Sequence, residues 1–308
     1  MNNNEMLADL EAIKKANSSV TLPEDVGRAY MQDVVAQGTT LAKLFIYPAT
    51  APVGTIDMIG IKKRNLKEHL GLDTEPTGSD LTEERSVPFT LKPVYTDTWL
   101  KNSDVYYTAR SRGQNIETII TSMIQQQFGA DLQDLAFNGD EDSADLFEKL
   151  QDGFLKLARE NADTVKHDVT GVVKVADLQK VPVKVAREQL RAGRFVWIMG
   201  AGTHAALQAE VMERETPKGD AVLIDGELSK LHGYAIELVD HIEDDVVLFT
   251  PLENLAVVTG FNVQYDRSGT SERAVAKQAT YHFVLSSIDF IIRTPKALVY
   301  IGADAVTP

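Results

Sequence analysis

The chain contains no cysteine among its 308 residues. It therefore has no disulfide bond, no thiolate metal ligand and no cysteine nucleophile. It also has no apolar run of about 18 residues, so the sequence predicts no membrane-spanning helix. Basic residues are in deficit, with 31 Lys and Arg against 45 Asp and Glu, and the formal net charge is −14. That balance disfavours sequence-independent binding to a phosphate backbone, which needs clustered positive charge.

The N-terminus lacks the pattern of a secretory signal, because no apolar core follows a basic segment there. Met6, Leu7, Leu10 and Ile13 instead fall on one face of a helix, which predicts a short N-terminal arm helix. A helix this short is marginal in water, so we expect it to lie against another surface.

Catalytic motifs are also missing. None of the six histidines lies three or four residues from another, so the sequence has no helical metal clip. It contains no nucleophile elbow, no Walker loop and no hydrolase triad order. We therefore predict no catalytic residues, no metal site and no cofactor, and a protein that is not an enzyme.

One glycine turn is a weak exception. Gly200-Ala201-Gly202 lies between a predicted strand and a predicted helix, with Ala205 at the third position of a dinucleotide-binding fingerprint. Asp225 stands about where the ribose-binding acid of such a site is expected. No further alternation of helix and strand follows, so we favour a tight turn that begins a helix.

An acidic segment resembles a calcium loop in part. Asp140 and Asp142 match its first and third positions. Ala144 and Asp145 occupy the positions of the next ligand and of the required glycine. The interpretation we favour is a solvated acidic turn.

The most regular pattern is a long helix, predicted from about Gln114 to Phe137 and ended by Gly139. At 1.5 Å per residue it would be roughly 35 Å long, which suits an architectural strut. Polar residues such as Gln125 fill much of one side. The opposite stripe comprises Ile116, Ile119, Ile120, Met123, Ile124, Phe128, Leu132 and Leu135.

The preceding segment differs in kind. Residues 53–66 and 85–100 alternate in part between apolar and polar side chains, and the stretch between them is rich in turn-forming residues. This predicts a long two-stranded excursion. An isolated hairpin is barely stable in water. The excursion therefore either rests on a neighbouring molecule or folds back on its own domain, and the sequence leaves both open.

Strands dominate the remainder of the chain. A helix is predicted from Pro182 to Gly193, then a buried strand at 194–200 and a helix capped by Thr203. Because strands then outnumber helices and do not alternate with them, the fold class is α+β. The further predicted strands cover residues 221–225, 234–239, 246–249, 255–259, 261–267 and 280–293, and the segment KALVYIG.

In this order, the segments resemble the major capsid proteins of tailed bacteriophages, which have the Hong Kong 97-type fold. FGADLQDLAFNGD, followed by LQDGFLKLA, resembles the family's helix end, Gly-Asp turn and next segment. RFVWIMGAGTHAALQ resembles its strand and helix, and TYHFVLSSIDFIIRTPKALVYIG resembles its closing element. GELSKLHGYAIELVDHIEDDVVLFTPLENLAVV resembles two further strands, although Ala235 stands where the family usually has proline.

The resemblance implies a division of the chain into four parts. Residues 1–50 would be an N-terminal arm and residues 51–100 an extended hairpin loop. Residues 101–173 and 263–293 would form a peripheral domain around a spine helix at about 114–137. Residues 174–262 and 294–308 would form an axial domain.

The resemblance also implies a structural function. Such a protein assembles into hexamers and pentamers that form the icosahedral head, which encloses phage double-stranded DNA without sequence-specific binding. The implied location is the virion, after assembly in the host bacterial cytoplasm, with scaffolding, portal and decoration proteins as partners and no membrane partner. Two alternatives stay open: the shell of a bacterial encapsulin nanocompartment with the same fold, and a nucleotide-dependent enzyme that uses the glycine turn.

Overall fold

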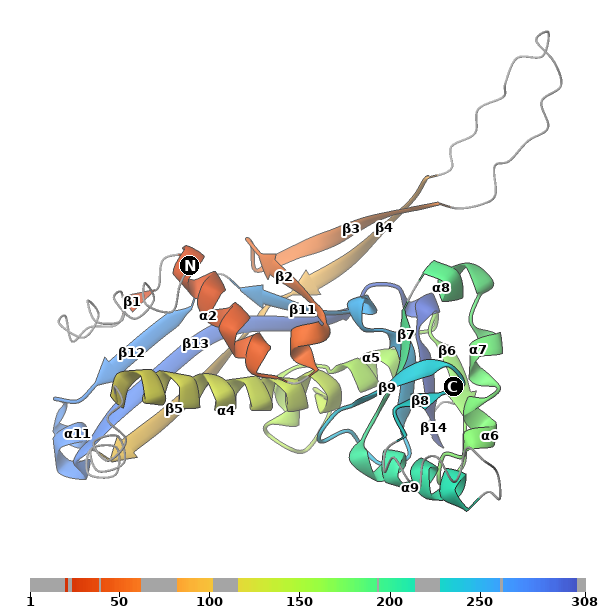
Figure 1. The fold of residues 1–308 in the computed structure, drawn as a ribbon. Coiled ribbons are helices and arrows are strands. Elements are labelled where there is room, and N and C mark those ends of the chain that lie inside the picture. Colours follow the sequence, from red (N-terminus) through yellow and green to blue (C-terminus); the bar gives the residue numbers. More distant parts are fainter. Residues whose placement is uncertain are drawn as a thin grey trace, which may run out of the picture.

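The computed structural model describes residues 20–21, 24–38, 40–61, 82–101, 116–192, 194–213, 228–260 and 263–303. In these ranges the strands form two six-stranded sheets and a separate two-stranded ladder. A long helix runs beneath the first sheet, and the two-stranded ladder projects away from the body (Figure 1). The arrangement is α+β, as the sequence predicts.

The first sheet is organised around the long strand β13, Ala279–Ile292. This strand pairs antiparallel with β5, with β11 and with β12. The short strand β1 adds to the outer side of β12, and β2 pairs parallel with β11. The partner strands are β1 Val20–Thr21, β2 Phe45–Ala49, β5 Lys92–Lys101, β11 Leu255–Gly260 and β12 Gln264–Ser268.

Two helices cover one face of this sheet. Helix α4, Ile116–Asn138, packs beside α2, Glu24–Gln37, and both contribute buried apolar side chains to one core (Figure 1). The α2 residues in this core are Tyr30, Met31, Val34 and Val35. Residues 24–49, which the resemblance assigns to the N-terminal arm, form α2, η1 (Leu41–Lys43) and β2. All the domain boundaries stay predictions.

Helix α4 begins and ends within two residues of the predicted positions, and its glycine stop is confirmed. Its predicted faces are only partly correct. Met123, expected in the core, is 56% exposed, whereas Gln125, expected on the polar side, is buried. The reason is that α4 has two neighbours, the sheet and α2, so its buried surface is wider than one stripe and differently centred. The side chains of Ile116, Ile119 and Ile120 lie outside the described residues.

The second sheet has the strand order β6-β14-β10-β7-β9-β8. Its core is rich in aromatic rings, with Trp197 and Phe249 at 4.2 Å between centroids. Three of its four helices are short: α6 Val175–Leu178, α7 Val181–Lys184, α8 Arg187–Ala192 and α9 Ala201–Met212. The strands are β6 Val165–Asp168, β7 Phe195–Met199, β8 Lys230–Leu231, β9 Tyr234–Leu238, β10 Val247–Pro251 and β14 Val299–Gly302.

Two predictions near this sheet are corrected. The single helix expected from Pro182 to Gly193 is divided into α7 and α8, because Val185 adopts an extended backbone between them. Gly193 and the predicted strand at 221–225 lie outside the described residues. Short elements complete the fold: α5 Phe154–Glu160, α11 Glu272–Lys277, η2 Glu148–Leu150, η3 Leu252–Asn254 and η4 Pro295–Ala297.

The predicted hairpin is present but shorter than expected. Strands β3, Val53–Ile61, and β4, Thr82–Thr90, pair antiparallel along their whole lengths. Residues 62–81, which include most of the predicted turn-rich stretch, lie outside the described residues. The sequence predicts a second strand that runs to Leu100. Instead β4 ends at Thr90, and β5 then joins the main sheet beside β13. The break falls at Leu91, whose backbone N–H donates to Pro52 O at 2.8 Å and closes the hairpin root.

Candidate assembly surfaces

The glycine turn between β7 and α9 already holds a carboxylate. A Cβ added at Gly202 would lie 2.1 Å from Oδ1 of Asp244, so that side chain packs against the first turn of α9. The next residue, Asp245, donates its backbone N–H to Thr203 Oγ1 at 3.0 Å. A phosphate placed at this helix start would meet a like charge, which argues against the dinucleotide interpretation. The prediction that Thr203 caps this helix is wrong, because the N-cap is Gly200. Asp225 lies outside the described residues.

The acidic turn after α4 is organised around a cation that the chain itself supplies. Nζ of Lys156 lies 2.7 Å from Asp140, 2.7 Å from Asp142 and 3.0 Å from Asp152. Burial alone would lower the pKa of Lys156, but the hydrogen bonds that its ammonium group donates to these carboxylates outweigh burial and raise that pKa. The turn is solvated, as predicted, with the Asp142 side chain 87% exposed, but the Lys156 side chain that its carboxylates hold is only 6% exposed. The ammonium group occupies the position that a metal ion would need.

The hairpin is anchored at its root by apolar contacts with the first sheet. Ile56 and Phe89 pack in a small cluster with Ala256, Val258 and Ile291. A Cβ on Gly54 would lie 2.7 Å from the Phe89 ring, so glycine is what lets that ring lie across the ladder. Beyond this cluster the described part of the hairpin leaves the body (Figure 1).

A buried carboxylate also holds the root. Asp289 on β13 accepts the backbone N–H of Thr90 at 2.7 Å and that of Phe290 at 2.8 Å, and it accepts the side chain of Gln151 as well. Burial raises the pKa of the Asp289 carboxyl, and these hydrogen bonds and the charge of Lys92 offset only part of the rise. An ion pair between Lys92 and Glu141 joins the root to the acidic turn. The hairpin is thereby fixed to both the sheet and the turn after α4.

The sheet face opposite α4 carries a row of aromatic side chains. We call Tyr95, Trp99, Tyr281 and Phe283 the aromatic face. Tyr95 stacks on Phe283 at 5.5 Å between centroids, and Trp99 lies 4.8 Å from Tyr281. Tyr95 is 65% exposed. Aromatic residues are enriched at protein interfaces, so this row is a candidate contact surface.

The aromatic face and the hairpin root lie on the same side of the sheet. Tyr281, Phe283 and Ile291 are separated by even numbers of residues along β13 and therefore point to one side. The root of the hairpin covers the Ile291 end of this side. Tyr95 is opposite Leu285, between the root and Tyr281, and no described helix or strand buries it.

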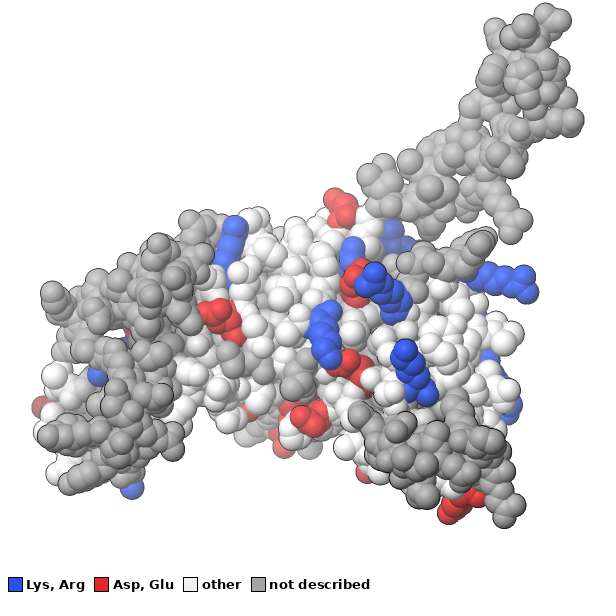
Figure 2. Space-filling model, viewed as in Figure 1, with Lys and Arg blue, Asp and Glu red and all other residues white. Residues whose placement is uncertain are grey.

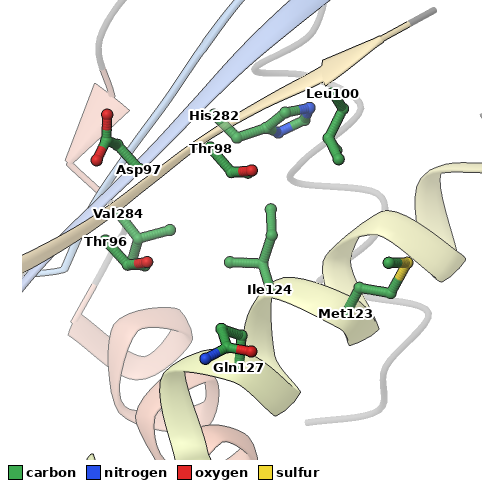
Figure 3. A pocket seen from close by; sticks show the side chains of 9 residues that line it. All are labelled: Thr96, Asp97, Thr98, Leu100, Met123, Ile124, Gln127, His282 and Val284. Carbon is green, nitrogen blue, oxygen red and sulfur yellow. The ribbon is translucent and has the colours of Figure 1, made fainter. Parts of the chain in front are cut away.

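A cavity lies on the opposite side of the sheet, between α4 and the strands β5 and β13 (Figure 3). Its volume is about 280 Å³. Met123 of α4 and His282 of β13 both line it, and Nδ1 of His282 lies 2.7 Å from the hydroxyl of Tyr265. The full lining is Thr96, Asp97, Thr98, Leu100, Met123, Ile124, Gln127, His282 and Val284.

Other functional features are few in the described part of the chain. No group of three or more acidic or histidine side chains there could hold a metal ion. None of the helices in the described ranges is long and apolar enough to cross a membrane. On the face shown in Figure 2, Lys and Arg side chains gather around the centre and right of the view, so the net negative charge is not spread evenly.

No protein-family model and no curated protein matches the sequence. Solved structures do match. A chain of the satellite phage P4 procapsid that includes the size determination (Sid) protein aligns with a TM-score of 0.69 at 17% identity, over 96% of both chains. The capsid of an empty GTA particle aligns with a TM-score of 0.55 at 13% identity, over 87% of this chain and 90% of that one.

A third match is a virus-like particle from Pyrococcus furiosus, with a TM-score of 0.53 at 13% identity over 89% of this chain and 97% of that one. At such identities the likeness is one of fold. The chain therefore has the Hong Kong 97-type fold that its sequence resembles, and the predicted fold class is confirmed.

Sequence reasoning found the hairpin but missed the aromatic face, the Asp289 contacts and the cavity. A signal for the aromatic face was available: Tyr95 and Trp99 on one predicted strand, and Tyr281 and Phe283 on another, each recur at even spacing. No local sequence pattern predicts the hydrogen bonds of Asp289, because its partners Thr90 and Gln151 are distant in the sequence.

Proposed function

We propose that this chain is the major capsid protein of a tailed bacteriophage. It would assemble into hexamers and pentamers that form an icosahedral head around double-stranded DNA. The observation that carries the proposal is the likeness to a phage P4 procapsid chain over 96% of both chains. The projecting hairpin supports it, because its own subunit contacts it at the root while an isolated ladder is barely stable in water.

The contact between neighbours would join hairpin to sheet. The hairpin of one subunit would lie over the open part of the aromatic face of the next, so each subunit gives one surface and receives another. Such head-to-tail contacts form a closed ring when the rotation between subunits closes. Obligate contacts of this kind commonly bury more than about 2,000 Å².

The wider setting follows from the same proposal. The protein would be located in the virion after assembly in the bacterial cytoplasm. Scaffolding, portal and decoration proteins would be its partners, and the DNA would be enclosed without sequence-specific binding. We also propose that the subunit is not an enzyme: the described glycine turn already holds the Asp244 carboxylate.

A second candidate is a nanocompartment shell of the encapsulin type, which would enclose protein instead of a genome. The observation in its favour is the likeness to the Pyrococcus furiosus virus-like particle. Both candidates use the same fold, so they would differ in what the shell encloses.

Electron microscopy of particles purified from the producing cells, after nuclease digestion, tests both candidates. Closed shells that contain protected double-stranded DNA are the result expected for the phage capsid. Closed shells that hold protein and no DNA would contradict the phage capsid and support the nanocompartment shell. A protein that stays monomeric at every concentration and salt tried would overturn both.

A further inference from the structure

The helices α6, α7 and α8 line one border of the second sheet, and this border is positively charged. Figure 1 places the three helices on the side of that sheet away from α4, and Figure 2 shows Lys and Arg side chains along the same side. We call the exposed side chains of Lys174, Lys180, Lys184 and Arg187 the basic border. Of these four, only Lys180 has an ion-pair partner in the described part of the chain, Asp177 at 3.5 Å.

An exposed apolar side chain lies among these charges. Val183 of α7 comes directly before Lys184 and is 87% exposed, whereas Val181 and Val185 are buried in the core. Val183 therefore contributes little to the packing of its own subunit. Covering an apolar side chain with another surface removes it from water, which is favourable. The basic border thus offers a partner both positive charge and a small apolar contact.

The loop that joins β9 to β10 has the opposite charge. We call residues 240–245 the acidic loop. Asp240 and Glu243 are exposed, and neither has an ion-pair partner within the described ranges. Asp244 is a further exposed carboxylate, which lies against the first turn of α9. A positively charged surface brought to this loop would therefore be attracted by carboxylates that the single chain leaves in water.

The backbone of the acidic loop is held in place at two points. Asn138, at the end of α4, donates its side-chain N–H to His241 O at 2.6 Å. Asp245 donates its backbone N–H to Thr203 Oγ1 at 3.0 Å. His241 and Asp245 have φ of 72° and 69°, in the left-handed region that favours glycine, and such a backbone persists only where its surroundings hold it. The loop is therefore ordered before any partner binds, which lowers the entropic cost of binding.

The basic border and the acidic loop belong to opposite faces of the second sheet. Trp197 and Ile198 are consecutive residues of β7, so they point to opposite faces. Val181 of α7 packs in the core that contains Trp197, whereas Ile242 of the acidic loop packs in the core that contains Ile198. The sheet therefore separates the two charged surfaces within one subunit, and no ion pair among the described residues joins them.

We infer that the basic border of one subunit docks on the acidic loop of a second copy of the same chain. The two surfaces have complementary charge, and each subunit carries both on different sides, so the contact is head to tail. The inference rests on the proposed function, to which it adds a second contact between neighbours besides that of the hairpin. Salt should weaken this contact, because the screening length falls from about 10 Å at 0.1 M to about 3 Å at 1 M.

Charge reversal tests the contact in the full-length protein. The border variant carries Lys174→Glu and Arg187→Glu, and the loop variant carries Asp240→Lys and Glu243→Lys. All four side chains are exposed in the subunit, so circular dichroism and thermal unfolding should stay as in the wild type. Each variant should reduce the yield of shells on a sedimentation gradient about tenfold or more, because like charges would face each other across the contact.

The matched control carries Lys149→Glu and Lys230→Glu, which change the net charge as the border variant does, at exposed positions outside the basic border. It should assemble as the wild type does. Normal assembly of the border and loop variants, or an equal loss in the control, would overturn the inference and leave the proposed function standing. A wild-type chain that stays monomeric would overturn the proposed function and this contact together, so the two failures are distinguishable.

Recombining the reversed surfaces separates a lost contact from a damaged subunit. A chain with all four substitutions again has complementary surfaces and should recover the wild-type yield of shells. In an equimolar mixture of border and loop variants, opposite charges meet only where the two chains alternate, and alternation closes only in rings with an even number of subunits. The mixture should therefore form rings of six and no rings of five in electron micrographs. No recovery in either experiment would overturn the inference.

Discussion

At the scale of single residues, buried charges determine how the hairpin and the acidic turn are held. Asp289 bonds the last residue of β4, and Lys156 gathers the carboxylates of the turn after α4. A buried charge is stable only where hydrogen bonds or opposite charges replace water. These two side chains therefore favour one conformation of the hairpin root and one conformation of the acidic turn.

We expect Asp289→Asn to loosen the hairpin root. Asparagine has one acceptor oxygen, so it cannot accept hydrogen bonds from Thr90 and from Phe290 at two separate oxygens as Asp289 does. Amide exchange at Thr90 should rise about tenfold, as losing about 1.4 kcal/mol implies. Asp57→Asn, an exposed change on the same hairpin, should leave that exchange unchanged. Unaltered protection of Thr90 in the Asp289 variant would refute the role.

The same variant should change the pH dependence of stability. Because the pKa of Asp289 is raised in the folded protein, its contribution favours folding below the unfolded value of about 3.9. That contribution is lost as the pH rises through the folded pKa. At neutral pH the wild type carries the cost of a buried charge, and its absence from the asparagine variant offsets part of the hydrogen bonding that the variant loses at Thr90. The wild type should therefore gain stability relative to Asp289→Asn as the pH falls toward 4, which urea unfolding at a series of pH values would measure.

Lys156→Met should destabilise the acidic turn by about 2 kcal/mol at pH 7, because three carboxylates would lose their cation. Lys149→Met, at an exposed position in the same turn, is the matched control and should cost less than about 0.5 kcal/mol. The hydrogen bond from Lys156 lowers the pKa of Asp140, so its stabilising contribution is present above about pH 4. The difference in urea unfolding between wild type and variant should shrink below that pH, and a difference independent of pH would contradict this account.

At the scale of elements, α4 is the strut on which the rest of the body depends. It packs on the sheet through Ile124, Phe128, Leu132 and Leu135, and its far end runs into the acidic turn. The hairpin, by contrast, is held at one end only among the described residues. Packing contacts among the described residues are therefore concentrated in α4 and the first sheet, which under the proposed function leaves the hairpin for contact with another subunit.

Ile124→Asp should abolish soluble folding, because it places an unpaired charge on the buried side of α4 at a cost of about 3 kcal/mol or more. Gln126→Asp, an exposed change two residues away, should leave folding intact. Circular dichroism of the soluble fractions makes the comparison. A soluble, folded Ile124→Asp protein would show that this side chain is not packed.

Shortening the hairpin tests its role in assembly. Ile61 and Thr82 are directly opposite in the ladder, so residues 62–81 can be replaced by Asn-Gly, a two-residue turn that suits hairpins. The shortened chain should fold with unchanged thermal stability and fail to form complete shells. Electron microscopy and size-exclusion chromatography provide the measurement. Normal particles from the shortened chain would show that residues 62–81 are not needed for assembly.

At the scale of the whole molecule, the two sides of the first sheet serve different purposes. One side is filled by α2 and α4, which make the main core. The other carries the hairpin root at one end and the aromatic face at the other. Under the proposed function, the hairpin of one subunit would contact the aromatic face of the next, and this contact would repeat from subunit to subunit.

Tyr95→Glu should reduce shell assembly at least tenfold while leaving the subunit folded, because Tyr95 is largely exposed in the single chain. A charge placed at the centre of a desolvated contact costs several times what the same charge costs on a free surface. Tyr95→Phe keeps the ring and should assemble normally. Gradient sedimentation of both variants measures the outcome, and wild-type assembly by Tyr95→Glu would exclude the aromatic face from the contact.

Local patterns in the amino-acid sequence were enough to predict the α+β class, most strand positions and both ends of α4. Those features depend on periodic apolar residues, on the Gly139 stop and on turn-forming residues between strands. The lack of cysteine and of catalytic motifs was likewise visible without coordinates.

Which surfaces pack against each other, by contrast, was decided only by the tertiary structure. The tertiary structure exposes Met123 and buries Gln125, because α4 contacts α2 as well as the sheet. It divided the second hairpin strand at Leu91, because β5 pairs with β13 from the far end of the chain. It brought Lys156 to the carboxylates of the acidic turn. Periodicity reports that a residue has a buried side, but contacts between distant segments determine what that side meets.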